Sequence, residues 1–511
     1  MSAARNGRDD AGNRVAITVA IMLATIMTSL DTTIANVALP HIQGSVSASA
    51  EQITWVLTSY IVASTIMTPL TGFLADRLGR KMLLMVSIIG FTVASMLCGV
   101  ASSLIEIVLF RLLQGIFGAT LIPLSQAVLL DINPPEKHGQ AMAVWGAGAV
   151  LGPVMGPVLG GWLTDNLDWR WVFFINLPIG ILAFFGVFLF LSEKKGLVKN
   201  RLDILGFATL SLAIGGFQMM LDRGPGQDWF GSREIWTYLI IVIISLWIFG
   251  VQIATAKKPF VDRALLRDAN FVICCVFGFF TGVLMFSVLA LLPPMMQTVL
   301  GYPVAFAGVV SMTRGVGSFL SMMFVGQLIG RVNIRAILLS GLTINTIALW
   351  QMAHFSLGMD SMPIAVSGFL SGLGTGLIFV PLSTIAFAKV APHLRAEGAG
   401  VYTLVRNIGS AAGISIMQAL YVSGAEKHHS ALVEHVRPDN PLFQAYRPET
   451  FSSEAAIAAF NGFIGQQARM LSYIDDFRLM VVLSLLCAPL ILLMRAPRKP
   501  PSGETSHAAI D

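Results

Sequence analysis

The sequence predicts an all-α integral membrane protein with fourteen transmembrane helices. Charged residues make up 12% of its 511 residues and hydrophobic residues 55%, whereas soluble domains carry roughly 25% charged residues. Apolar runs of about 18 to 27 residues recur along the chain, and each can cross a hydrocarbon core of roughly 30 Å as a helix. Because lipid offers the backbone no hydrogen-bond partners, such long, non-alternating runs are expected to be helical.

The runs are numbered here as spans 1 to 14. They cover residues 15–39, 52–74, 82–102, 104–130, 139–163, 171–191, 203–221, 235–255, 270–292, 304–328, 336–354, 363–388, 397–421 and 477–494. Span 1 is too long for the apolar part of a signal peptide and is followed by further spans, so we expect it to be retained.

Basic residues alternate between the two sides of the predicted membrane layout. With the N-terminus inside, the inside loops and termini hold 22 Lys and Arg, whereas the short outside loops hold only Arg170, Arg223 and Arg233. Because basic residues near span ends stay on the cytoplasmic side, both termini are predicted to be cytoplasmic.

The loops divide the spans into groups of six, two and six. A basic linker, 192–202, follows span 6, and a second basic stretch, 256–268, precedes the last six spans. We therefore expect an N-terminal bundle at 1–191, a linker with two inserted helices at 192–268 and a C-terminal bundle at 269–511. A polar outer segment at about 422–475, helix-like from Glu454 to Leu471, is either a solvated cap or a docking surface for a periplasmic partner.

Several function classes lack support in the sequence. The four cysteines lie inside apolar runs, the three histidines of the outer segment lack metal-site spacing, and no set of nucleophile and base is present. No GxxxxGK[ST] loop and no basic patch with aromatic residues point to nucleotide or nucleic-acid binding. The sequence thus predicts no metal, no cofactor and no enzyme, and energy must come from an ion gradient or a partner.

Asp31 is an acidic residue inside span 1, roughly 13 Å below its outer end. At 100° per residue, Thr28, Thr32 and Asn36 lie on the same side of the helix, so this side is expected to face a cavity. Arg111 in span 4 lies at a similar depth of about 11 Å. A charge inside the membrane is costly and by default marks a functional site.

We expect Asp31 to carry a proton and Arg111 to act as the cation that controls it. A neighbouring cation favours the ionised form of a carboxylate and burial disfavours it, so a conformational change can release or take up a proton. The alternative is a permanent structural ion pair.

Two further arginines, Arg314 in span 10 and Arg406 in span 13, lie mid-span. They are expected to line the substrate path, to bind backbone carbonyls or to contact an anionic drug. The polar residues predicted to line the substrate cavity are Thr28, Thr32, Asn36, Gln114, Arg314, Arg406 and Asn407.

Glycine motifs predict close helix contacts and a latch. In span 5, Gly148, Gly152, Gly156 and Gly160 recur every four residues, which favours a smooth helix-packing ridge that either is fixed or moves. After span 2, Gly72 and Gly79 permit a tight turn, and Asp76 can pair with Arg80 or with the end of a neighbouring helix. Such a latch would favour the outward-open state.

These segments resemble known signatures. Residues 72–81, Gly-Phe-Leu-Ala-Asp-Arg-Leu-Gly-Arg-Lys, resemble the GxLADRxGRK signature of the major facilitator superfamily, with Gly72, Asp76, Arg77, Gly79 and Arg80 in place. An echo at Gly326 to Arg331 lacks the Asp. Residues 111–115 resemble the Arg motif linked to proton transfer, and 152–161, with Gly152, Pro153, Gly156, Pro157, Gly160 and Gly161, resemble the antiporter motif, although an early glycine of its extended form is Ala143.

Residues 30–40 and 169–180 resemble hallmarks of the fourteen-span drug:proton antiporters, closest to the EmrB type within the EmrB/QacA group. The resemblance covers nearly the whole chain. It implies a major facilitator fold, in which two pseudo-symmetric six-helix bundles rock around a central cavity and two further helices are inserted between them. It also implies an EmrA-type periplasmic adaptor and a TolC-like outer-membrane channel as partners.

The predicted function is proton-coupled efflux of small lipophilic drugs by alternating access within membrane lipids. One rival is a dedicated exporter of a metabolite such as a siderophore or a fatty acid, which a growth assay with a substrate panel would separate. A membrane sensor or membrane-embedded enzyme is the rival of another class; transport by purified protein in liposomes would decide it.

Overall fold

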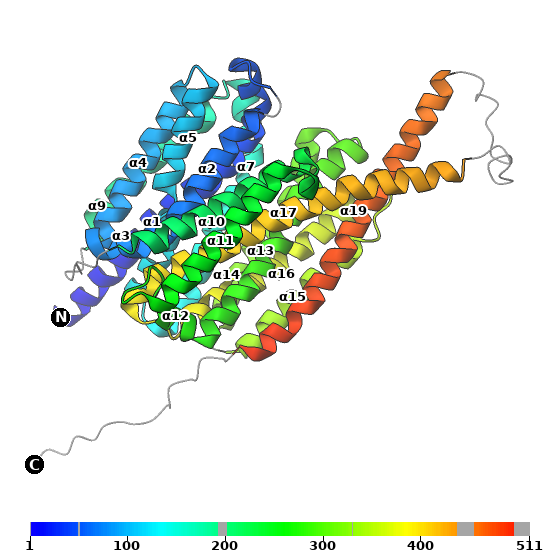
Figure 1. Cartoon of the computed structure of the whole chain (residues 1–511). Coiled ribbons are helices and arrows are strands. Elements are labelled where there is room, and N and C mark those ends of the chain that lie inside the picture. Colours follow the sequence, from blue (N-terminus) through cyan, green and yellow to red (C-terminus); the bar gives the residue numbers. More distant parts are fainter. Residues whose placement is uncertain (1, 50–51, 193–201, 330, 437–453, 495–511) are drawn as a thin grey trace, which may run out of the picture.

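The computed structural model describes residues 2–49, 52–192, 202–329, 331–436 and 454–494 (Figure 1). Within these residues, fourteen helices are long and apolar enough to cross a membrane, and each overlaps one predicted span. The predicted helical class and the number of spans are therefore confirmed. The central part of the basic linker at 192–202 and Gly330 lie outside the described residues.

The first six spans are built from nine helices. They are α1 (Ser2–Ser45), α2 (Trp55–Met67) continued by α3 (Thr71–Leu78), α4 (Arg80–Val100), α5 (Leu104–Gly118) continued by α6 (Leu121–Ile132), α7 (His138–Asn166), and α8 (Trp171–Phe174) followed by α9 (Asn176–Phe190).

The inserted pair and the last six spans follow in order. They are α10 (Ile204–Arg223) and α11 (Arg233–Thr255), the short α12 (Arg263–Arg267), and then α13 (Ala269–Pro294), α14 (Val304–Leu328), α15 (Ile334–Met352), α16 (Ser361–Phe387), α17 (Arg395–Glu434) and α19 (Glu454–Leu493).

Side-chain caps fix where several helices begin. The Ser103 hydroxyl accepts a hydrogen bond from the Glu106 backbone N–H at 3.3 Å, so α5 starts at Leu104. Asp268 and Asn333 cap α13 and α15 in the same way. These bonds satisfy backbone donors that a helix leaves free at its first turn.

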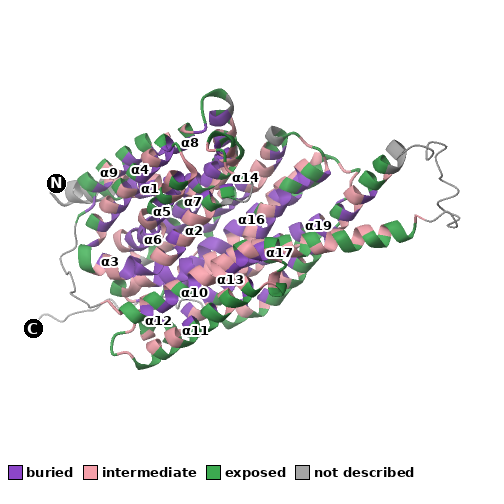
Figure 2. Ribbon diagram, turned by 45° about the horizontal axis from the view of Figure 1, so that its top comes forward, coloured by how far each residue is buried: buried purple, intermediate pink, exposed green. Residues whose placement is uncertain are grey.

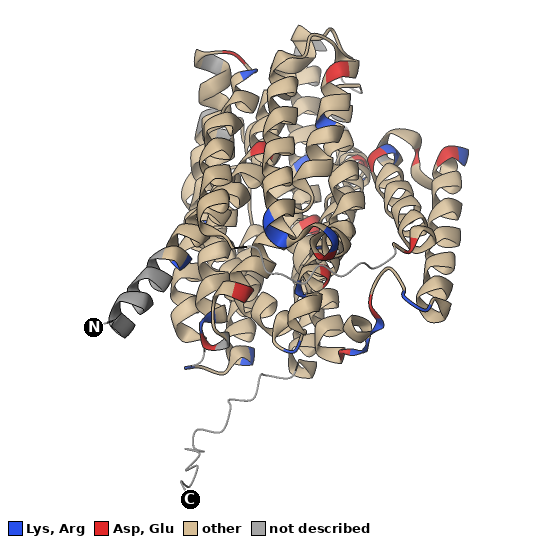
Figure 3. Cartoon of the chain, turned by 90° about the vertical axis from the view of Figure 1, so that its left-hand side faces the viewer, with Lys and Arg blue, Asp and Glu red and all other residues tan. Residues whose placement is uncertain are grey.

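Charge and burial follow the expected membrane pattern. Charged residues lie mostly toward the helix ends, and few lie along their middles (Figure 3). Among the membrane-length helices, α11 is the least buried, with 11% of its most apolar window buried, and Figure 2 shows it largely exposed. It packs mainly on α10, so most of its surface is left for lipid.

The described residues of the outer segment at 422–475 are mostly helical. Helix α17 runs on to Glu434 and α19 begins at Glu454, as predicted for the second helix, and residues 437–453 lie outside the described part. At 1.5 Å per residue, a helix of 40 residues is about 60 Å long, twice the hydrocarbon thickness. The two extensions are joined by His428 to Asp475 at 2.8 Å and His429 to Asn461 at 3.0 Å, and they project from the bundle in Figure 1.

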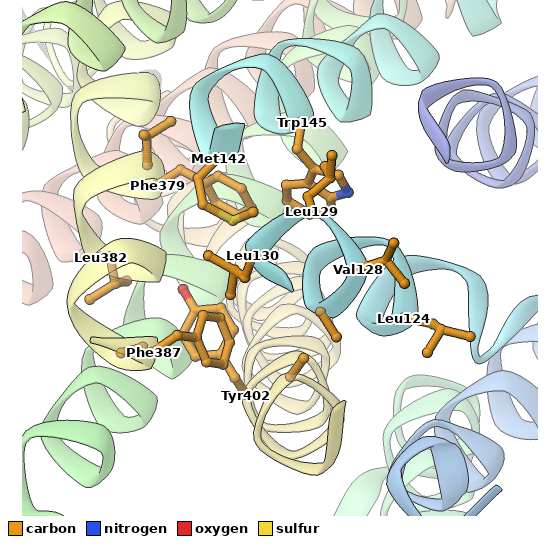
Figure 4. Packing of buried hydrophobic residues seen from close by; sticks show 14 of the residues in the cluster. Leu124, Val128, Leu129, Leu130, Met142, Trp145, Phe379, Leu382, Phe387 and Tyr402 are labelled. Carbon is orange, nitrogen blue, oxygen red and sulfur yellow. The ribbon is translucent and has the colours of Figure 1, made fainter. Parts of the chain in front are cut away.

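The largest core cluster joins the first six spans to the last six at the end where α1 begins and α19 ends, called here the terminal end. Trp145 of α7 stacks on Phe379 of α16, with ring centroids 5.7 Å apart. Figure 4 shows Met142 beside Phe379, and Leu130 on the side of Phe387 and Tyr402. This packing closes the terminal end of the molecule.

Helices α7 and α14 part toward the opposite, outer end. Near the terminal end, a Cβ added at Gly326 would lie 2.8 Å from the Ala143 Cβ, which shows that the two helices touch. Their contact continues to Val154 and Gly315. Two helical turns beyond this level on the same two faces, a Cβ added at Gly161 or at Gly308 would meet nothing within 4 Å, so the two helices no longer touch there.

Candidate functional site

The structure brings Asp31 of α1 and Arg111 of α5 into direct contact. Asp31 Oδ2 accepts a hydrogen bond from Arg111 Nη1 at 2.6 Å, and both side chains are only 1% exposed. The two residues therefore form a buried ion pair between spans 1 and 4. Such a pair is held only where neighbouring groups satisfy its remaining hydrogen bonds.

Two neutral side chains complete the shell around the Asp31 carboxylate. Its second oxygen, Oδ1, accepts from Gln114 Nε2 at 2.8 Å and from Asn176 Nδ2 at 2.9 Å. Arg111 Nη1 also donates to Gln114 Oε1 at 2.8 Å. Asn176 in turn donates to the Ser95 hydroxyl at 2.9 Å, so spans 1, 3, 4 and 6 meet at one carboxylate.

The Arg111 guanidinium is enclosed by α2 and by aromatic rings. Its Nε donates to the Val56 carbonyl at 3.2 Å, and its Cζ lies 4.5 Å from the Tyr60 ring centroid and 5.7 Å from that of Phe173. Ring faces attract a cation, and more strongly when water is excluded. The arginine is thus stabilised without access to bulk water.

Asp31 is the acidic group of this cluster. Arginine stays protonated in proteins, and the amides of Gln114 and Asn176 do not titrate, so the carboxylate is the group whose charge a bound proton would remove. Protonation would remove the anion that Arg111 faces and would free the guanidinium to seek another acceptor. Loss of this anion would leave spans 1 and 4 without the ion pair that joins them.

The other polar residues of span 1 do not join the cluster. Thr28 is buried and donates to Thr25 O at 2.9 Å within its own helix. Thr32 and Asn36 lie 100° and 140° around the helix from Asp31 and are exposed. Of the neutral cavity candidates, only Gln114 contacts the carboxylate.

The two arginines of the last six spans lie apart from Asp31. Arg314 Nη2 donates to the Met285 carbonyl of α13 at 2.8 Å. Arg406 Cζ lies 5.3 Å from the Phe379 ring centroid, and Asn407 next to it is half-buried. Within the described part of the chain, neither arginine makes a salt bridge to an acidic residue, so each keeps an uncompensated charge inside the protein.

The loop motif after span 2 forms a contact with α17 at the terminal end. Gly79 has a φ of +84°, which permits the turn between α3 and α4. A Cβ added at Gly72 would lie 2.7 Å from the Glu397 Cβ and 2.8 Å from its Cα. Glycine at 72 is therefore required for α3 to approach α17 this closely.

The pairing expected of Arg80 is different in the structure. Arg80 forms its salt bridge with Asp131 at the end of α6 and not with Asp76, because the start of α4 lies beside that helix end. Arg395 of α17 also binds Asp131, at 2.9 Å, and Arg80 Nη2 donates to the Pro392 carbonyl at 3.0 Å. One acid thus ties α4, α6 and α17 together. Arg77 lies at the end of α3 and has no salt bridge among the described residues.

The glycine ridge of α7 packs on α1. A Cβ added at Gly152 would lie 2.5 Å from Ser29, and one at Gly160 would lie 3.3 Å from the Ile34 carbonyl. Gly148 and Gly156 face the same helix, whereas Gly161 has open space. The helix runs without a break through Pro153 and Pro157. The ridge therefore holds span 5 against the helix that carries Asp31.

Sequence reasoning missed several residues of these two sites. Asn176, Asp131 and Arg395 were not predicted, although an amide inside the apolar run at 171–191 is a detectable signal. Asp131 and Arg395 lie at span ends, where charges are ordinary. Nothing in the sequence marks them as partners.

The sequence is similar to a known family of membrane proteins. The family model described as "Major Facilitator Superfamily" matches residues 21–414. The chain is 36% identical over 458 residues to "Multidrug export protein EmrB" of Escherichia coli K12, covering 89% of each chain. It is 34% identical over 486 residues to "Fatty acid resistance protein FarB" of Neisseria gonorrhoeae, covering 94% of this chain and 96% of that one.

Among solved structures, the proton:xylose symporter XylE superposes with a TM-score of 0.60 at 13% identity, covering 95% of this chain and 97% of that one. At this identity the match shows the fold alone.

Proposed function

The chain belongs to the major facilitator superfamily, whose members are transport proteins and not enzymes, and from this we propose that it is a proton-coupled multidrug efflux antiporter. It exports small lipophilic compounds by alternating access. Its relatives include EmrB multidrug export proteins over most of its length. The observation that carries the coupling proposal is the buried Asp31–Arg111 pair at 2.6 Å.

Asp31 binds a proton from the outer side, and this drives the return step. In the present arrangement its carboxylate is held by three donors. Protonation weakens each of these charge-assisted bonds, because they are strongest to the ionised acid. Spans 1 and 4 can then reorganise. A neighbouring cation weakens proton binding by Asp31, whereas burial strengthens it. Bringing the cation closer or exposing the acid to water therefore releases the proton on the other side.

The terminal-end contacts act as the gate that must open on the inside. Asp131 with Arg80 and Arg395 joins the two bundles there, and Gly72 lets α3 pack on α17. The side chain of Asp131 is 8% exposed, and those of Arg80 and Arg395 are 21% and 16% exposed. These bonds are therefore largely shielded from water and must break when the gate opens. With the terminal end closed and α7 and α14 parted beyond Val154, the arrangement fits the outward-facing state.

The substrate path runs between the bundles. Thr32 and Asn36 are exposed polar groups of span 1, whereas Arg314, Arg406 and Asn407 lie on spans 10 and 13. Thr28 and Gln114 are buried beside Asp31. Aromatic and aliphatic walls bind largely through area, which favours broad specificity. The two unpaired arginines would suit substrates with an acidic group.

The membrane orientation and the partners belong to the same proposal. The count of 22 basic residues on one side against three in the short loops of the other supports a cytoplasmic location for both termini in a bacterial inner membrane. The paired extensions of α17 and α19 then reach into the periplasm. There they would meet an EmrA-type adaptor leading to a TolC-like channel.

A second candidate is export of one metabolite, and the FarB relative favours a fatty acid. A panel of drugs and fatty acids separates the two in a growth assay. Resistance to several unrelated drugs supports multidrug export. Resistance to one compound class alone supports the dedicated exporter.

Drug-dependent proton movement in proteoliposomes tests the coupling proposal. The intact chain should move protons when drug is added against an imposed pH gradient, and Asp31→Asn should not, while both bind drug equally well. Thr18→Ala, on the same helix but near the terminal end, is a control that should behave like the intact chain. Full drug–proton exchange by Asp31→Asn would exclude Asp31 and leave the ion pair structural.

A further inference from the structure

The inserted helix α10 lies between the two bundles on one side of the molecule. It packs against α2 of the first six spans and against α17 of the last six. In Figure 1, α10 (green) lies between α2 (blue) and α17 (yellow to orange). On the side where α7 and α14 meet, those two helices touch directly. The two seams between the bundles therefore differ in construction.

At its outer end, α10 is firmly attached to α17. The Ser415 hydroxyl donates to the Leu221 carbonyl at 2.9 Å, and this bond is buried. Met220 and Leu221 form an apolar cluster with Ala412 and with Ile235 of α11. The bond is thus shielded from water and supported by apolar packing, so the inserted pair should move with the last six spans.

The next residue along α10 is attached to the other bundle. The Thr58 hydroxyl of α2 donates to Asp222 Oδ1 at 3.1 Å, and this bond is exposed. It is longer than the Ser415 bond and open to competing water. The neighbouring Arg223 lies 3.9 Å from Glu234 of α11, so a charged contact within the inserted pair supports the end of α10.

Closer to the terminal end, apolar residues of α2, α10 and α17 pack together. Leu210 and Ile214 of α10 cluster with Leu404 of α17 and with Ile66 of α2. Below this level the turn between α2 and α3 approaches α17 directly, since a Cβ added at Gly400 would lie 3.0 Å from the carbonyl oxygen of Thr68 in that turn. Apolar contacts are not directional, so helices that share them can slide past each other more easily than helices joined by directional hydrogen bonds.

We propose that Asp222 is a positioning residue. Its hydrogen bond to Thr58, called here the bracket, holds the outer ends of the two bundles at the spacing seen here and breaks in each transport cycle. This rests on the alternating access of the proposed function. Leu221 and Asp222 are adjacent but bound to opposite bundles. Rocking of the bundles changes the distance between α2 and α17 at the outer end, so both bonds cannot persist, and the exposed Thr58 bond is the one that yields.

Asp222 acts in this bracket as a hydrogen-bond acceptor, not through its charge. Asn keeps an acceptor oxygen at the same position, whereas Ala removes it. On the other side, Ser keeps the hydroxyl donor of Thr58 and Val removes it with little change in shape. These four substitutions form two matched pairs.

Distances between spin labels at Trp162→Cys and Val309→Cys, at the outer ends of α7 and α14, report the opening directly. They are measured in purified protein in lipid discs, and the four native cysteines are buried, so the chain without added cysteines gives the background. Thr58→Val and Asp222→Ala should each shift the population toward shorter distances by about five- to tenfold in ratio. Thr58→Ser and Asp222→Asn should match the intact chain, and Thr58→Val with Asp222→Ala should add nothing to either change alone.

Crosslinking tests whether the bond must break. A short bifunctional thiol reagent joining Thr58→Cys to Asp222→Cys should stop drug efflux, with recovery after reductive cleavage of the link. Joining Arg223→Cys to Glu234→Cys, within the inserted pair, should leave efflux unchanged.

Two outcomes would overturn the bracket: label distances that are unaffected by both Thr58→Val and Asp222→Ala, or full efflux by the crosslinked Thr58–Asp222 pair. The label distances do not depend on drug transport. If the intact chain moved no protons with drug yet the distances shifted as expected, the proposed function would fail and the bracket would stand.

Discussion

Asn176, the first residue of α9, donates a hydrogen bond of 2.9 Å to the carboxylate of Asp31, which lies 145 positions earlier in the chain. The same amide nitrogen also donates to Ser95. Span 6 thereby binds Oδ1 of the acid of span 1, whereas Arg111 binds its Oδ2. The neutral amide of Asn176 stabilises the ionised acid without adding a second charge. Its removal therefore tests the hydrogen bond alone.

Replacing Asn176 with Ala should slow drug–proton exchange about tenfold while drug binding stays unchanged. The reason is the loss of one charge-assisted bond, worth roughly 1.5 to 3 kcal/mol. Exchange rates in proteoliposomes and drug binding to purified protein are the two measurements. Asn166→Ala, near the outer end of α7 and exposed, serves as the control. A variant with equal loss in binding and in exchange would indicate a general folding defect.

Removing Arg111 alone should destabilise the protein strongly. Arg111→Met leaves the Asp31 charge buried without its cation, which costs about 3 to 5 kcal/mol. The double variant with Asp31→Asn should recover most of the thermal unfolding midpoint in detergent, because no charge is then left unpaired. Equal unfolding midpoints for the single and double variants would contradict the view that the two charges depend on each other.

The Gly72 contact should control opening of the terminal end. Gly72→Ala places a methyl group against the backbone of Glu397 and should force α3 and α17 apart. An added cysteine at Ala143, which is buried between α7 and α14, should then react faster with a maleimide supplied from the terminal side. Gly250→Ala, with open space around it, is the matched control and should give the labelling rate of the intact chain.

Substitution by alanine in the glycine ridge of α7 should destabilise the protein at Gly152 but not at Gly161. Gly152→Ala should cost about 1 to 3 kcal/mol relative to Gly161→Ala, because its methyl group meets Ser29 whereas that of Gly161 meets nothing within 4 Å. Both changes gain the same helix propensity, so the comparison isolates packing. Thermal unfolding in detergent measures it, and equal midpoints would rule out close packing at Gly152.

Local composition was sufficient to predict the spans of this protein and its two charges at the candidate site. The fourteen spans could be read from the sequence because the hydrophobic thickness of a bilayer sets a length that apolar runs either meet or do not. Asp31 and Arg111 stood out for the same reason, since a charge within such a run is costly. The helical stretch starting at Glu454 was also visible, although its union with span 14 into one helix of 40 residues was not.

Partners across helices required the tertiary structure. Asp31 and Asn176, Asp131 and Arg395, and Thr58 and Asp222 are each joined only because particular helix faces meet. Helical periodicity tells which residues share a face but not which face lies opposite. For that reason Asp76 was a reasonable partner for Arg80 on sequence distance, and Asp131 took that place once α6 and α17 were packed beside α4.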